Sequence, residues 1–134
     1  MTWRDIERQV IARAADRCEY CRMHQSLQGA SFHVEHILPR SRGGLSDLSN
    51  LAWACPGCNL HKADRIAAAD PTTGESVSLF HPRQQVWIEH FHWRDYHVVG
   101  LTACGRATVD ALGFNHVRRL QVRQAEELFD LFPP

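Results

Sequence analysis

The sequence predicts an α+β domain in which a short β-hairpin and a following helix surround a bound metal ion. Two pairs of cysteines, Cys18 with Cys21 and Cys55 with Cys58, bracket a segment that contains two short strand-like runs. Hydrophobic residues recur at helical spacing before this segment, and strand-like and helix-like patterns alternate after it. These observations place a metal-held core between an N-terminal helix and a C-terminal strand–helix extension.

We expect one domain over residues 1–134, because chains of this length usually fold around a single core. Within it we expect an N-terminal helix in residues 1–17, a core in 18–69 and an extension in 70–134. No run approaches the roughly 18 apolar residues of a membrane span, and the N-terminus lacks the apolar core of a signal peptide. We therefore expect a soluble cytoplasmic protein without a membrane partner, whose oligomeric state the sequence does not indicate.

The first predicted element is an amphipathic helix over Thr2–Asp16. Thr2 followed three residues later by Asp5 is typical of a helix N-cap. The apolar residues at helical spacing are Trp3, Ile6, Val10 and Ala14.

In the core, weak alternation over Ser31–Glu35 and the run Leu51–Ala54 predict two strands that pair as a hairpin with a long loop. Pro39 ends the first strand, and the Gly-Gly that follows it favours a turn. The alanine-rich segment Asn59–Ala69 predicts a helix that ends before Asp70-Pro71.

The extension begins with a predicted turn at Asp70–Gly74. Strands are predicted at Val86–Trp93 and His97–Leu101, and a short helix, beginning at Thr102 or Arg106, ends at Leu112. Asn115 is the expected N-cap of a last helix. Its predicted apolar face consists of Val117, Leu120, Gln124, Leu128 and Leu131.

The two cysteine pairs predict a structural zinc site. Zinc takes four thiolates in a tetrahedron, and each Cys-x-x-Cys turn supplies two of them. The Pro-Gly inside the second pair favours a structural turn over the redox-active dithiol that a single Cys-x-x-Cys also fits. For such a small unit the metal contributes folding free energy directly.

Polar residues between the pairs form a candidate hydrolytic site. Hydrolysis of a phosphodiester needs an activated water and neutralisation of the charge that grows on phosphate. His36 can accept a proton near neutral pH, while Glu35 and the amide oxygen of Asn59 are ligands that a hard cation such as Mg²⁺ prefers. Adjacent strand residues point to opposite faces, so Glu35 and His36 converge only if the chain bends there.

These elements together resemble the HNH endonuclease family, whose fold is a ββα-metal unit. The resemblance runs from Cys18 to about Asp64, and a weaker one to small stand-alone bacterial and phage-like members continues beyond Leu79. The matching blocks are Cys-x2-Cys, Val34-Glu35-His36-Ile37-x-Pro39, Ser41-Arg42-Gly43-Gly44, Asp47-Leu48-x-Asn50-Leu51 and Cys55-x2-Cys58-Asn59-x2-Lys62.

The resemblance implies a role for each matching position. His36 is the general base, Asn50 orients the base and its loop, and Glu35 and Asn59 hold the catalytic divalent ion. The chain departs from the common pattern at two positions: Glu35 replaces the more frequent Asp, and Asn59 stands where His is often found, so that Mg²⁺ or Mn²⁺ is the expected ion.

The implied activity is metal-dependent hydrolysis of DNA. The formal net charge is zero, so no global attraction to nucleic acid is expected, and phosphate contacts must come from individually placed groups. The candidates are Arg40, Arg42, Lys62 and Arg65. The alternative is a non-catalytic zinc-stabilised DNA-binding or adaptor module, in which the Glu35 substitution has removed activity.

Overall fold

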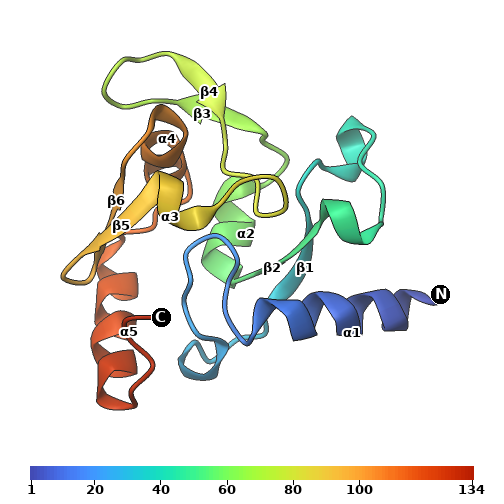
Figure 1. The fold of residues 1–134 in the computed structure, drawn as a ribbon, viewed down its shortest axis with the longest axis horizontal. Helices are drawn as coiled ribbons and strands as arrows, with labels where there is room; N and C mark the ends of the chain where they lie inside the picture. Colours follow the sequence, from blue (N-terminus) through green and yellow to red (C-terminus); the bar gives the residue numbers. More distant parts are fainter.

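The computed structural model describes residues 1–134 as a mixed α+β fold with three separate two-stranded antiparallel sheets. The N-terminal helix and the last helix lie at opposite ends of the molecule, and the first hairpin and α2 lie between them (Figure 1). The elements in chain order are α1 Trp3–Ala14, β1 His33–His36, β2 Leu51–Ala54, α2 Pro56–Lys62, β3 Ala67–Ala69, β4 Ser76–Ser78, α3 Trp87–His90, β5 Phe91–Arg94, β6 His97–Gly100, α4 Ala103–Ala111 and α5 Val117–Leu128.

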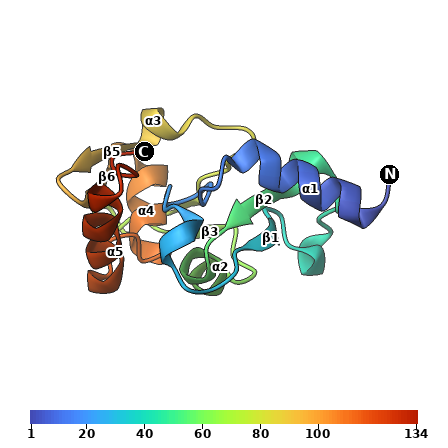
Figure 2. The ribbon, with the colours of Figure 1, turned by 90° about the horizontal axis from the view of Figure 1, so that it is seen from below.

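Helix α1 forms as its sequence predicts. Thr2 is its N-cap and exchanges hydrogen bonds with Asp5, which satisfies backbone groups that a helix end leaves unpaired. Val10 and Ala14 are buried on the face that packs against β1 and β2 (Figure 2). Helix α1 therefore packs on the hairpin and is not part of the cluster that contains the four paired cysteines.

Strands β1 and β2 pair antiparallel, with His36 opposite Leu51 and His33 opposite Ala54. The predicted hairpin is thus present, and α2 follows it directly. The loop that joins the two strands contains short 3-10 turns at Arg40–Arg42 and Leu48–Asn50. In Figure 1 this loop lies above α1. It carries Asn50, whereas Glu35 and His36 lie in β1 and Asn59 lies in α2.

The predicted helix over Asn59–Ala69 is wrong in both bounds. Helix α2 begins at Pro56 and ends at Lys62, where Ala63 turns to a positive φ of 49°. Ala67–Ala69 instead forms β3, which pairs with Ser76–Ser78. Alanine has the highest helix propensity, but propensity is a weak preference, and strand pairing across the Asp70 turn overrides it.

The extension also departs from its predicted elements. The expected strand over Val86–Trp93 begins as the short helix α3, and only Phe91–Arg94 pairs with β6. The last helix is capped by His116, because the Asn115 side chain instead bonds the backbone of Val98 in β6.

The predicted apolar face of α5 is wrong as well. Val117 and Leu128 are exposed, whereas the buried residues of this helix are Arg119, Arg123 and Glu126. Buried charged side chains need polar partners. Arg119 donates to Cys58 Sγ, and Glu126 accepts a hydrogen bond from the His24 N–H.

One hydrophobic cluster joins the cysteine unit to the extension. It contains the four paired cysteines together with aromatic residues of the extension, among them Phe80, Trp87, Phe91 and Phe114. Trp87 also donates its indole N–H to the carbonyl of Tyr20 at 2.8 Å. None of the helices combines the length and apolar character that crossing a bilayer requires.

Candidate metal centre and hydrolytic site

The four paired cysteines form one buried cluster, in which all four Sγ atoms lie within 4.8 Å of one another. Cys21 Sγ and Cys55 Sγ are 3.7 Å apart, too far for a disulfide. A tetrahedral zinc with Zn–S bonds of about 2.3 Å needs sulfur atoms roughly 3.8 Å apart. The cluster therefore fits a zinc ion, and no other group of three or more His, Cys, Asp or Glu side chains in the chain has metal-binding spacing.

Backbone N–H groups inside each Cys-x-x-Cys turn point at sulfur. Cys21 N–H donates to Cys18 Sγ at 3.5 Å, and Cys58 N–H donates to Cys55 Sγ at 3.3 Å. Cys55 is at the same time the N-cap of α2, so the second turn begins that helix. Burial raises the pKa of the Cys18 and Cys58 thiols well above the ordinary value, so metal loading must displace protons.

His36 stands at the end of β1 in a defined setting. Its Nε2 lies 2.8 Å from Ser46 Oγ, and its ring is parallel to the Trp3 indole at a centroid distance of 6.4 Å. Partial burial, with smaller contributions from the charges of Arg40 and Lys62, lowers the pKa of His36 below its ordinary value. The imidazole is therefore neutral near pH 7, as a general base must be.

Asn50 ties the loop between the strands together. Its Oδ1 accepts from Leu38 N–H at 2.8 Å, and its Nδ2 donates to the carbonyls of Leu38 and Leu45 at 3.0 and 2.9 Å. Gly44 lies so close that a Cβ there would stand 1.7 Å from the Leu38 oxygen. The amide thus fixes the loop segment that presents Ser46 to His36.

Glu35 is buried and engaged at both oxygens. Tyr20 donates its hydroxyl to Oε2 at 2.7 Å, and Lys62 donates from Nζ to Oε1 at 2.6 Å and to the Ile37 carbonyl at 2.8 Å. Burial raises the pKa of Glu35, and the Lys62 charge opposes that rise. Lys62 is only 1% exposed, so it is not a surface group free to meet a phosphate.

The structure separates Glu35, the predicted metal ligand, from His36, the predicted general base. Glu35 and His36 are consecutive residues of β1, and the bend that would make them converge is not present between them. Glu35 contacts Tyr20 and Lys62, whereas His36 contacts Trp3 and Ser46. Asn59 precedes Lys62 by three residues on α2, so the two side chains are neighbours on the helix surface.

The predicted phosphate contacts divide into two groups. Arg40 and Arg42 are exposed in the loop after His36, although Arg42 Nε also donates to the Asp64 carbonyl at 2.8 Å. Arg65 lies beyond the end of α2 and donates to the carbonyls of His61 and Ala111, so its guanidinium has a structural role. Of the four predicted phosphate contacts, only Arg40 and Arg42 are therefore exposed cations.

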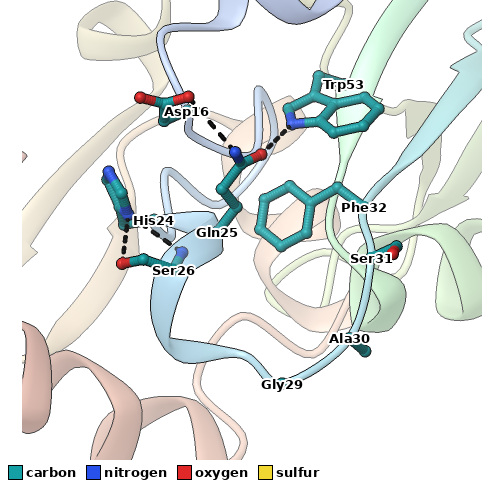
Figure 3. A pocket seen from close by; sticks show the side chains of 9 residues that line it. All are labelled: Asp16, His24, Gln25, Ser26, Gly29, Ala30, Ser31, Phe32 and Trp53. Atoms are coloured by element: carbon teal, nitrogen blue, oxygen red, sulfur yellow. Dashed lines mark hydrogen bonds between the residues drawn. The ribbon is translucent and has the colours of Figure 1, made fainter.

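A separate surface pocket lies at the other end of the hairpin, where the Gln25 side chain bridges Asp16 and the Trp53 indole (Figure 3). Phe32 packs against Trp53 on its wall. None of the predicted site residues lines this pocket. It is therefore distinct from the candidate hydrolytic site.

Three residues at the site escaped the sequence analysis in these roles. Trp3 and Ser46 contact His36, and Tyr20 contacts Glu35. The position of Tyr20 between the first two cysteines is a usable signal, because the four-cysteine cluster brings that turn to the hairpin. No pattern in the sequence marks Ser46.

Comparison with known proteins agrees with the resemblance. The family model of the HNH endonuclease matches residues 18–65, a segment that contains the four clustered cysteines and both asparagines of the candidate site. No curated protein and no solved structure matches the chain.

Proposed function

We propose that this protein is a DNA endonuclease that hydrolyses phosphodiester bonds with His36 as general base and with a divalent ion. The setting of His36 is the observation that carries the proposal. When Nε2–H donates to Ser46 Oγ, Nδ1 keeps its lone pair and is the atom that takes a proton from water. The lowered pKa keeps that lone pair available at neutral pH.

The loop around His36 supports the same role. Asn50 fixes the loop through three hydrogen bonds, and Trp3 covers one face of the imidazole. The ring is therefore oriented before substrate arrives, which reduces the entropy lost in the reaction. Arg40 and Arg42 lie in the same loop as exposed cations for the DNA backbone.

Two metals belong to the proposal. The clustered cysteines hold zinc as a structural ion, and Glu35 with Asn59 offers oxygen ligands for Mg²⁺ or Mn²⁺. When bound, that second ion neutralises charge that develops on the phosphate and the leaving oxygen. Lys62 now holds the Glu35 carboxylate at 2.6 Å, so the ion has to replace the ammonium as its partner.

The same ion pair favours a second candidate, a non-catalytic zinc-stabilised DNA-binding or adaptor module. Both Glu35 oxygens already accept hydrogen bonds from Tyr20 and Lys62. A carboxylate satisfied in this way needs no metal, so the site would serve stability alone.

Cleavage of supercoiled plasmid with Mg²⁺, Mn²⁺ or Ni²⁺ distinguishes the two candidates. We expect nicking by the wild type and by His33→Ala, a matched change at an exposed histidine of the same strand. His36→Ala should lose at least about 100-fold in rate with zinc content and circular dichroism unchanged. Undiminished cleavage by His36→Ala would refute the general base, and DNA binding without cleavage in all three metals would establish the second candidate.

A further inference from the structure

Arg119 in α5 is a buried cation that no carboxylate neutralises. It is 8% exposed, and the three ion pairs of the molecule all involve other residues. Its single side-chain hydrogen bond runs from Nη1 to Cys58 Sγ at 3.3 Å. Because burying an unpaired charge is costly, the negative group that compensates Arg119 has to be the cysteine cluster.

The neighbouring buried arginine of α5 shows the contrast. Arg123, one turn further along, donates to the carbonyls of Tyr96 and Phe114 and lies over the Trp93 ring. Those partners are neutral backbone and aromatic groups. Arg119 has no such partners, and its Nη2 has none at all.

Gly57 makes room for this contact. A Cβ at this position would stand 2.2 Å from Arg119 Nη2, well inside contact distance. Gly57 lies within the second Cys-x-x-Cys turn, next to the cysteine that accepts the bond. The absence of a side chain there is what lets the guanidinium reach the sulfur.

We propose that Arg119 is an outer-sphere residue of the zinc centre. Four thiolates on Zn²⁺ carry a net charge of −2, and the guanidinium offsets one of these charges while its N–H···S bond stabilises the Cys58 thiolate. The residues of this bond are 61 positions apart, so α5 secures the metal that holds the hairpin and α2. The extension thereby stabilises the metal centre, whether or not the protein cleaves DNA.

The test compares two adjacent arginines in the zinc-loaded full-length chain. Arg119→Gln should bind zinc about 10- to 100-fold more weakly in competition with a chelator, the usual effect of removing an outer-sphere partner. Arg118→Gln is the matched control, because Arg118 is exposed and makes no side-chain contact with sulfur. Arg119→Lys keeps the charge but loses the planar guanidinium, so its zinc affinity should lie between those of Arg118→Gln and Arg119→Gln.

Two further measurements separate a role at the metal from general support of the fold. In the cobalt-substituted protein, the thiolate-to-cobalt charge-transfer band should shift in Arg119→Gln and not in Arg118→Gln. Gly57→Ala retains Arg119 in the sequence and raises the helix propensity of α2. Its Cβ nevertheless pushes the guanidinium away from the sulfur, so zinc affinity should fall in this variant too. Zinc affinity and cobalt spectra equal to those of Arg118→Gln would overturn the proposal. If Arg119→Gln fails to fold, wild-type zinc affinity in Gly57→Ala would overturn it equally.

Discussion

Replacing Asn50 by alanine should loosen the loop that carries His36 without unfolding the rest of the chain. The amide makes three hydrogen bonds that close the segment from Leu38 to Asn50. Because this loop is at the surface, each bond contributes roughly 0.7 kcal/mol, and their loss costs about 2 kcal/mol of loop stability. An opening equilibrium changed by that amount is about 30-fold more populated.

Hydrogen exchange measured peptide by peptide tests this expectation. Amides between Ile37 and Leu48 should exchange about 30-fold faster in Asn50→Ala, while those of α5 keep their rates. Asn50→Asp retains the acceptor for Leu38 N–H but loses both donated bonds, so its exchange should be intermediate. Equal protection of the loop in wild type and Asn50→Ala would refute the reasoning.

Two further changes test buried charges. Asp70 accepts two hydrogen bonds from Arg106, which lower the pKa of its carboxyl to about 2, below the roughly 3.9 of an unfolded chain. The ionised Asp70 carboxylate therefore stabilises the fold above pH ~4, and this stabilisation is lost as pH falls through 2. In thermal melts across that range, Asp70→Asn should lose less stability than the wild type. Equal losses in the two proteins would contradict this. Lys62→Met leaves the Glu35 carboxylate buried without its cation and should cost about 3–5 kcal/mol in urea denaturation. The double variant with Glu35→Gln should recover part of that loss, and no recovery would show that the ion pair is not responsible.

Local patterns were sufficient for the elements whose ends are marked by capping, cysteine or proline residues in the sequence. Helix α1 carries its own cap, and strands β1 and β2 have bounds close to the predicted ones because the cysteine turns and Pro39 delimit them. Predictions failed where pairing or packing with another element outweighs local propensity. Ala67–Ala69 pairs with Ser76–Ser78 instead of extending α2, and Trp87 lies in the short helix α3, where its indole donates to the Tyr20 carbonyl.

The same distinction between local pattern and contacts with other elements applies to the candidate site. The choice of His36 and Asn50 from motif spacing stays a prediction, and the Asn50 amide does bond the loop that follows His36. The opposite orientation of Glu35, its bond to Tyr20 and its pairing with Lys62 were not identifiable. They depend on which face of β1 meets α2, and a four-residue strand is too short to reveal that by alternation.

By itself, the sequence predicted the four-cysteine cluster, because two thiol pairs at turn spacing can share one metal ion, and the structure brings the four sulfur atoms together. It also predicted the candidate hydrolytic residues, whose roles stay a proposal. Only the tertiary structure decided which charges are buried and with whom, and it placed Arg119 against Cys58 and Lys62 against Glu35. Electrostatic pairing acts across space between elements distant in the chain, and no local periodicity records it.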